Sequence, residues 1–173
     1  MPSQKKLFTF LNVVLIIGML ISLFLVYEHF SPTASKFCTF GESLNCGIVN
    51  KSPYANLDGI FYLLVIDFGM NVPMMDISRA NVFLDLITSN AFLGFLTLLF
   101  MLFLARSKYK NKDFLWIKRD KGLKWMRGIA IFGVLYGFYL FLIQHSILKT
   151  YCIFCLALDI ALIAILITVW KIK

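Results

Sequence analysis

Four cysteines are the residues of this sequence best suited to redox chemistry, and they form two close pairs. Cys38 and Cys46 lie in the segment CTFGESLNC, and Cys152 and Cys155 lie in CIFC. A C-x-x-C pair at the start of a helix is typical of redox-active thiols, because the positive end of the helix dipole favours a thiolate at the first cysteine. We therefore expect Cys152 to exchange disulfides and Cys155, one turn further along, to face the lipid.

The chain around these cysteines has the composition of an integral membrane protein. Of its 173 residues, 60% are hydrophobic and only 15% are charged, and the mean hydropathy is +0.83. A membrane-spanning helix needs about 20 apolar residues. Four segments meet this requirement, and we expect a single all-α domain, a four-helix membrane bundle, with spans at about residues 7–27, 86–105, 128–148 and 152–170.

The distribution of charge predicts the orientation of this bundle. The sequence has 17 Lys and Arg residues, and 13 of them flank the expected spans in a way that places them on one side of the bilayer. Cytoplasmic loops of membrane proteins carry such an excess. The net charge of +8 is therefore a sign of topology and does not indicate nucleic-acid binding.

Residues 57–86 include an apolar stretch that could be mistaken for a fifth span. Asp67, Asn71 and Pro73 interrupt it, and a fifth span would place the basic loop outside and separate the two cysteine pairs. We therefore expect a surface or half-inserted helix. The prediction is an outer cap of residues 28–85, a cytoplasmic basic loop of residues 106–127, cytoplasmic termini and all four cysteines at the outer face.

Three kinds of chemistry remain open for the cysteines. An even number of cysteines at an oxidising outer face favours disulfides, which could be purely structural. Four thiolates could instead hold zinc, although no part of the predicted fold needs a metal. The third possibility is a thiol relay, in which the first pair exchanges disulfides with the second and a lipid-soluble carrier in the bilayer accepts the electrons.

The arrangement resembles the vitamin K epoxide reductase family, including its bacterial and archaeal disulfide-forming members. The similar features are a loop pair that precedes the C-x-x-C pair, the C-x7-C spacing, Ser52 six residues after the second loop cysteine, and SNAFLG, Ser89 to Gly94, at the start of the second span. The resemblance covers about residues 7 to 170.

The resemblance implies a role for each cysteine. Cys38 would receive electrons from a thioredoxin-like protein that acts in trans, and Cys46 would exchange with Cys152. Cys155 would then pass the electrons to a quinone, which could be vitamin K, menaquinone or ubiquinone. No metal is implied.

The resemblance also implies a quinone site in the membrane. Asn90 would donate a hydrogen bond to a quinone oxygen, and Ser52 would support the loop that carries the first pair. Vertebrate members have a tyrosine where this chain has Asp159, so the second quinone contact does not transfer directly.

Asp159 is a functional candidate in its own right, because a carboxyl group is expensive to place inside a span. It follows Cys155 by four residues and so lies on the same helix face, about 6 Å further along. A protonated Asp159 could donate to a quinone oxygen or pass on a proton. Alternatively, Tyr136 or Tyr139 on a neighbouring helix could satisfy the carboxyl group.

The predicted function is that of a membrane thiol:quinone oxidoreductase that supports disulfide bond formation, in a bacterial or archaeal plasma membrane rather than the endoplasmic reticulum. One alternative is a reductase of vitamin K, as quinone or epoxide, that uses the same relay. The alternative from a different class is a non-catalytic membrane protein held by two structural disulfides.

Overall fold

The computed structural model describes residues 2–31, 38–39, 41, 43–71, 73, 76–110 and 119–172. Within these ranges the secondary structure is helical and contains no β-strand, only isolated bridges. The all-α prediction is therefore confirmed.

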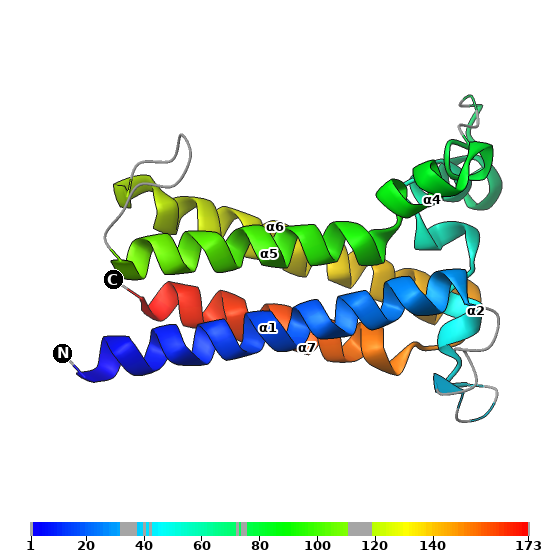
Figure 1. Ribbon diagram of the computed structural model, residues 1–173. Coiled ribbons are helices and arrows are strands. Elements are labelled where there is room, and N and C mark those ends of the chain that lie inside the picture. Colours follow the sequence, from blue (N-terminus) through cyan, green and yellow to red (C-terminus); the bar gives the residue numbers. More distant parts are fainter. Residues whose placement is uncertain are drawn as a thin grey trace.

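Four long helices lie side by side and form the body of the molecule (Figure 1). They are α1 (Pro2–Phe30), α5 (Asn90–Lys110), α6 (Arg119–Ile143) and α7 (Ile153–Lys171). Each contains a segment long and apolar enough to cross a membrane, namely Gln4–Phe30, Asn90–Tyr109, Lys121–Leu148 and Ile153–Lys171. This confirms the prediction of four spans and identifies an integral membrane protein.

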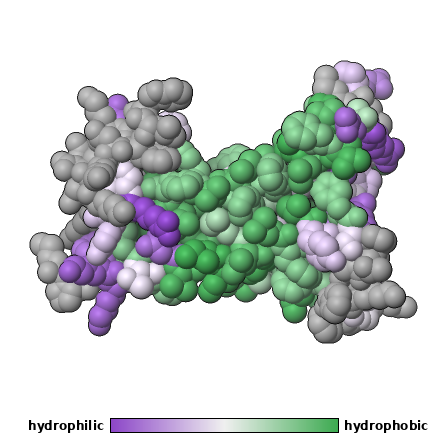
Figure 2. Space-filling model, viewed as in Figure 1, coloured by the Kyte–Doolittle hydropathy of each residue, from purple (hydrophilic) through white to green (hydrophobic). Residues whose placement is uncertain are grey.

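The surface of the bundle has the polarity expected for a bilayer. Figure 2 shows apolar side chains around the middle of the molecule and polar side chains at its two ends. The outward-facing Leu20, Phe132 and Ile160 are 61%, 67% and 68% exposed, as expected for side chains that contact lipid instead of water. We call the end where α1 begins and α7 ends the basic end, and the opposite end the cysteine end.

The helices pack around an apolar core that runs through the half of the bundle nearer the basic end. α1 contacts α5 and α7, and α6 contacts the same two helices. Leu11, Leu15, Leu98, Met101 and Ile165 are almost completely buried at their centre. At the cysteine end a second buried cluster includes Leu25, Val49 and Ala91 together with the cysteines, so the cysteine sulfurs lie inside the fold.

The second span begins four residues later than the hydropathy pattern predicts. The apolar run contains two helices, α4 (Val82–Thr88) and α5, separated at Ser89, whose backbone is extended with φ −62° and ψ 129°. The Ser89 hydroxyl accepts a hydrogen bond from the backbone N–H of Phe92 at 3.2 Å, as an N-cap residue does. The N-cap residue Ser89 therefore separates α4 from α5 and places Asn90 at the first position of the span.

Residues 57–86 form short elements at the cysteine end and do not cross the bundle. They include α3 (Gly59–Tyr62), a π-helical turn η3 (Leu63–Asp67), a 3-10 turn η4 (Ser78–Ala80) and α4. Before them come α2 (Cys46–Asn50) and the 3-10 turn η2 (Pro53–Ala55). Figure 1 shows α2 and α4 at the end of the bundle opposite the chain termini.

The helices at the basic end extend further than expected. α5 continues to Lys110 and α6 begins at Arg119, so helix occupies both ends of the expected loop 106–127, and residues 111–118 of that loop lie outside the described residues. Lys and Arg are good helix formers, so a helix can continue through a basic segment. A cluster of positive charge therefore indicates where a helix leaves the membrane, but the helix itself can end several residues later.

The last two spans are joined by a tight reversal that sets the position of the C-x-x-C pair. α6 continues into a π-helical turn, η5 (Gln144–Leu148), and Lys149 then adopts a left-handed conformation with φ 51°. α7 starts four residues later. This short connection holds the start of α7 against the end of α6.

Candidate functional site

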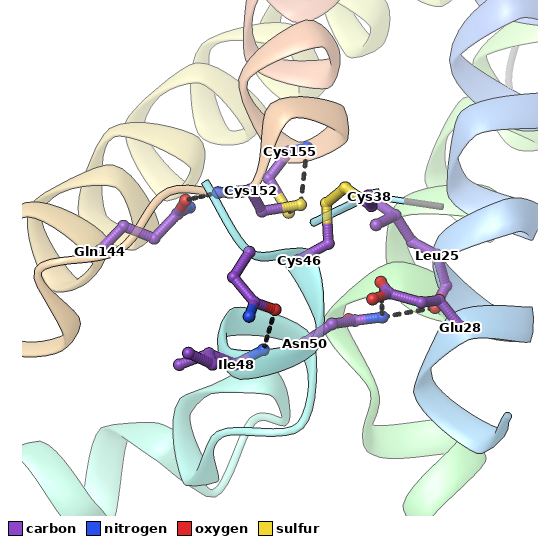
Figure 3. Close-up of a disulfide and its surroundings, with 10 residues drawn as sticks. Leu25, Glu28, Cys38, Cys46, Ile48, Asn50, Gln144, Cys152 and Cys155 are labelled. Atoms are coloured by element: carbon purple, nitrogen blue, oxygen red, sulfur yellow. Dashed lines mark hydrogen bonds between the residues drawn. A yellow bond between two sulfur atoms is a disulfide. The ribbon is translucent and has the colours of Figure 1, made fainter. Parts of the chain in front are cut away.

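All four cysteines meet at the cysteine end of the bundle (Figure 3). Cys38 and Cys46 form a disulfide with their Cα atoms 5.5 Å apart, while Cys152 and Cys155 are thiols. The Sγ atoms of Cys38, Cys46 and Cys152 lie within 4.8 Å of one another, and those of Cys152 and Cys155 are 2.6 Å apart. The structure thus brings both pairs into one sulfur cluster.

Backbone hydrogen bonds join the two segments that carry the pairs. The N–H of Asn45 donates to the carbonyl of Tyr151 at 3.0 Å, and the N–H of Tyr151 donates to the carbonyl of Ser43 at 3.0 Å. Asn45 directly precedes Cys46, and Tyr151 directly precedes Cys152. Each pair therefore fixes the position of the other, although more than 100 residues separate them in the sequence.

Cys152 occupies the N-cap position of α7. Its sulfur accepts a hydrogen bond from the backbone N–H of Cys155 at 3.2 Å, and its own N–H donates to Gln144 Oε1 at 2.9 Å. A hydrogen bond donated to sulfur, together with the helix dipole, stabilises negative charge on that atom. This position suits a sulfur that must accept and release a disulfide partner.

Cys155 faces the interior of the bundle, and the expectation that it faces lipid was wrong. It is partly buried, packs against the cysteine cluster and lines an inner cavity of about 90 Å³. Helical spacing from Cys152 gives the depth of Cys155, but the rotation of α7 about its axis depends on its packing against α1 and α6.

The predicted quinone-site residues line this same inner cavity. Asp159 comes from α7, Asn90 from the first turn of α5, and Ser52 from the cap. Hydropathy and spacing placed these residues at one end of the molecule, and the structure brings them around one cavity with Cys155.

Asn90 is held by two hydrogen bonds. Its side-chain Nδ2 donates to the carbonyl of Tyr54 at 3.0 Å, and its Oδ1 accepts from the hydroxyl of Tyr136 at 2.7 Å. An amide nitrogen carries two hydrogens, so one donor remains for a ligand in the cavity. The orientation of the amide group is set before any ligand binds.

Ser52 supports the helix that follows Cys46. Its hydroxyl donates to the carbonyl of Val49, one of the last residues of α2, at 2.7 Å. Beside it, the Tyr54 hydroxyl donates to Asp67 at 2.6 Å, and burial together with this carboxylate raises the pKa of Tyr54 to about 12. Tyr54 therefore remains a hydrogen-bond donor at neutral pH. Its bond to Asp67 joins two segments of the outer cap beside the cavity.

Asp159 does not make the tyrosine contacts that were the alternative to a functional role. The Tyr136 hydroxyl donates to Asn90 instead, and the buried Tyr139 hydroxyl has no hydrogen-bond partner within the described ranges. The carboxyl group of Asp159 packs against Gly137 of α6.

A buried carboxyl group and its partner were missed by the sequence analysis. Glu28, near the end of α1, is completely buried, and its Oε2 accepts a hydrogen bond from Asn50 Nδ2 at 3.1 Å. The same nitrogen donates to the carbonyl of Leu25 at 2.6 Å, and Figure 3 shows this group beside the disulfide. The sequence places this glutamate at the expected membrane boundary, where a charged side chain is usually exposed, and it contains no signal that the outer cap would bury it.

His29 links the same region to α4. Its Nδ1 lies 2.6 Å from the carbonyl oxygen of Asn50, and its Nε2 lies 3.0 Å from Asp85 Oδ1. These contacts link α1, α2 and α4.

The cysteine cluster also bears on the zinc hypothesis. Three of the four cysteine sulfurs lie close enough together to share an ion, but zinc requires thiolates, and in this structure Cys38 and Cys46 are bonded to each other. The geometry therefore suits disulfide exchange.

Comparison with protein families gives a match that covers nearly the whole chain. The family described as vitamin K epoxide reductase matches residues 9–170, a range that includes both cysteine pairs and all or most of each span. A comparison with curated proteins finds no match. The chain belongs to the vitamin K epoxide reductase family and is thus an oxidoreductase of the membrane.

Proposed function

We propose that this protein is a membrane thiol:quinone oxidoreductase that supports disulfide bond formation. The observation that carries the proposal is the continuity of the site: the sulfurs of Cys38, Cys46 and Cys152 lie within 4.8 Å of one another, and Cys155, next to them, lines a cavity inside the membrane bundle. Electrons can pass along this series by thiol–disulfide exchange, in which the thiolate of one cysteine attacks a disulfide sulfur of the neighbouring pair.

The first stage transfers electrons from a reduced thioredoxin-like protein. A thiolate of the partner attacks Cys38, which breaks the Cys38–Cys46 bond and releases Cys46 as a thiolate. The second thiol of the partner then displaces Cys38, so that the partner leaves as a disulfide and the loop pair is reduced by two electrons.

The second stage moves the electrons inward when Cys152 and Cys155 are oxidised. The Cys46 thiolate attacks Cys152 and releases Cys155, and Cys38 then attacks Cys46 to restore the loop disulfide. Both inner cysteines are now reduced.

The final stage reduces a quinone, which takes two electrons and two protons while the Cys152–Cys155 disulfide forms again. The free amide hydrogen of Asn90 would stabilise negative charge on one quinone oxygen, and a protonated Asp159 would donate to the other. Donors oriented in advance in a medium of low dielectric are the most effective at this task. The protein's own residues thus supply both the electrons and the hydrogen bonds.

The proposed orientation places the cysteine end outside. Lys and Arg residues concentrate at the basic end, which fits a cytoplasmic location, and the thioredoxin-like partner would act in trans from the outer side. A bacterial or archaeal plasma membrane fits this arrangement. The four spans, the outer cap and the basic loop would work as a single domain.

The test is quinone reduction by the purified protein in detergent, driven by dithiothreitol or by a reduced thioredoxin-like protein. Cys155→Ala should abolish turnover with either reductant. Cys38→Ala should abolish it mainly with the protein reductant, because Cys38 is the proposed point of attack for the partner's thiolate. Ser146→Ala, an exposed change at the same end, serves as the control. If the wild type reduces no quinone although both disulfides form, the proposal fails and the cysteines are structural.

The family description supports a second candidate activity at the same site. A vitamin K epoxide reductase uses the same four cysteines but reduces the epoxide or the quinone as its biological substrate. Supplying the epoxide in the same assay distinguishes the two, because only the second activity consumes it.

A further inference from the structure

Glu28 is a buried acid beside the sulfur cluster, and the relay described so far does not use it. It is 0% exposed, although it lies only two residues before Phe30, where α1 ends. A charge removed from water is costly unless it is paired and hydrogen-bonded. An ionisable side chain in such a position within a membrane protein is therefore a functional candidate.

The hydrogen bonds of Glu28 satisfy only one of its two carboxyl oxygens. Oε2 accepts from Asn50 Nδ2 at 3.1 Å, whereas the buried Oε1 has no hydrogen-bond partner within the part of the chain that the structure describes. A carboxylate with a purely structural role is expected to have donors at both oxygens, because buried polar groups are almost always hydrogen-bonded. Oε1 is therefore the atom that can take up a proton or give one to a neighbour.

The packing of α1 against α2 places this carboxyl group close to Cys46. Cys46 and Asn50 are four residues apart on α2, and Leu25 and Glu28 are three residues apart on α1, so each pair shares one helix face. Leu25 packs with Cys38 and Cys46 in the buried cluster, and Asn50 bonds to both Leu25 and Glu28. The two faces thus meet, and Figure 3 shows Glu28 beside the disulfide.

The proposed relay needs a proton carrier at Cys46. Cleavage of the Cys38–Cys46 bond releases Cys46 as a thiolate, and the site of this anion is buried. Cys46 must be a thiolate again when it attacks Cys152, because the thiolate and not the thiol is the nucleophile. An ordinary thiol has a pKa of about 8.5, so rapid exchange at neutral pH requires a base that removes its proton.

We infer that Glu28 carries this proton for Cys46. When the partner's thiolate attacks Cys38, the Cys46 sulfur leaves with the electron pair of the S–S bond and receives the proton of the Glu28 carboxyl group. When Cys46 attacks Cys152, the Glu28 carboxylate takes the proton back, and Cys155 leaves with the electron pair of the inner disulfide. The inference rests on the proposed function, because it assigns a residue to the exchange steps of that relay.

The other titratable groups that face Glu28 come from three helices. They are His29 on α1, Lys51 after α2, and the sulfur cluster, which includes Cys152 at the start of α7. His29 lies 3.0 Å from Asp85 of α4, and Lys51 Nζ donates to the carbonyl of Ser31 at 2.9 Å. Because these groups also respond to pH, substitutions at Glu28 are needed to separate its proton from theirs.

The test follows disulfide exchange in the absence of quinone. The purified protein, with both pairs oxidised, is mixed with reduced thioredoxin in detergent and quenched with acid, and alkylation with mass spectrometry then gives the rate at which Cys152 and Cys155 become reduced. At neutral pH, Glu28→Gln should lower this rate by about 100-fold, the usual contribution of a general acid–base group. At about pH 9.5 the loss should fall below about tenfold, because an ordinary thiol ionises there without help.

Glu28→Asp separates proton transfer from a structural role. Gln keeps the shape of Glu and can accept the Asn50 hydrogen bond but cannot carry the proton, whereas Asp keeps the acid on a shorter side chain. Glu28→Asp should therefore exchange faster than Glu28→Gln at neutral pH, and its own loss should also shrink at the higher pH, so either variant tests the inference if the other does not fold. The reverse order, or losses that are equal at both pH values, would show that Glu28 is structural and overturn the inference.

Asp58→Asn is the matched control. Asp58 is a second buried carboxyl group of the cap, 2% exposed, whose Oδ2 accepts from the backbone N–H of Ser78 at 2.7 Å, and it lies outside the sulfur cluster. Any loss in this variant should be the same at both pH values, and a loss with the pH dependence of Glu28→Gln would contradict the inference. If the inner pair of the wild type never becomes reduced, the proposed relay itself has failed.

Discussion

Asn90 and Asp159 line the same cavity but are held in different ways. Hydrogen bonds with Tyr54 and Tyr136 fix the amide of Asn90. Asp159, in contrast, is positioned by shape, because its carboxyl group occupies the space left by Gly137. The Asn90 amide from α5 and the Asp159 carboxyl group from α7 thus line one cavity with Cys155.

Removing the Asn90 amide should slow quinone reduction more than it weakens quinone binding. A lost donor to a developing oxyanion typically lowers kcat by about 100-fold or more, and we expect this of Asn90→Ala. Tyr136→Phe leaves the amide in place but removes one of its supports, so its loss should be smaller. Steady-state kcat and KM measured separately for both variants test this. Equal kcat in Asn90→Ala and wild type would exclude a role for the amide in the chemical step.

Gly137→Ala should act through Asp159. The added methyl group overlaps the carboxyl oxygen and forces the side chain to rotate, so quinone turnover should fall about as far as it does in Asp159→Ala. Gly128 lies on the same helix, and a Cβ atom added there meets no atom within 4 Å. Gly128→Ala should therefore leave the rate of quinone turnover unchanged. The rate of the double variant Gly137→Ala/Asp159→Ala decides the matter, since a further drop would show that the two residues act independently.

At the level of elements, Asn50 joins α1 to α2 beside the disulfide. Its side-chain nitrogen donates to α1 at Leu25 and Glu28, and its backbone carbonyl lies against His29. α2 starts with Cys46 and ends with Asn50, so these contacts at its last residue hold the helix that carries one reactive sulfur.

Asn50→Ala should therefore destabilise the cap. It leaves the buried Glu28 carboxyl group without its hydrogen-bond donor, and such a loss typically costs about 1–3 kcal/mol. The same change made in a Glu28→Leu background should cost less, because no carboxyl group then lacks a donor. The change in the free energy of unfolding in detergent measures both effects. Equal costs in the two backgrounds would show that the Asn50–Glu28 bond contributes no stability.

For the whole molecule, the two ends of the bundle differ in both charge and chemistry. Lys5, Lys6, Lys121, Lys124 and Lys171 lie at the helix ends that form the basic end, and the sulfur cluster lies at the other. Because the helices fix this separation, the orientation of the protein in the membrane decides which compartment supplies the thiols.

The proposed orientation predicts which surface positions an impermeant thiol reagent reaches in intact cells. Ser146→Cys, exposed at the cysteine end, should be labelled from outside, and Lys121→Cys, exposed at the basic end, should be labelled only after the membrane is opened. Wild type gives the background, which should be low because Cys38, Cys46 and Cys152 are buried and Cys155 faces the inner cavity. The reverse pattern would show that the protein is inserted the other way round.

The sequence by itself determined the features that depend on local composition. Four apolar segments specify four spans because the bilayer requires about 20 apolar residues for each crossing. Polar residues within 57–86 indicated a segment that stays at the surface, and the order and spacing of the cysteines indicated the family. The spans and the surface segment can each be read within a window of a few tens of residues, and the cysteine pattern needs only the order of two short motifs along the chain.

Only the tertiary structure decided how these elements face one another. The break at Ser89 is hidden in a continuous apolar run, the burial of Glu28 depends on a cap that folds over α1, and the inward direction of Cys155 depends on the rotation of α7. Gly137 receives Asp159 because two helices pack at one particular register. Such contacts join residues far apart in the chain, and hydropathy and spacing carry no information about which distant side chain fills a given space.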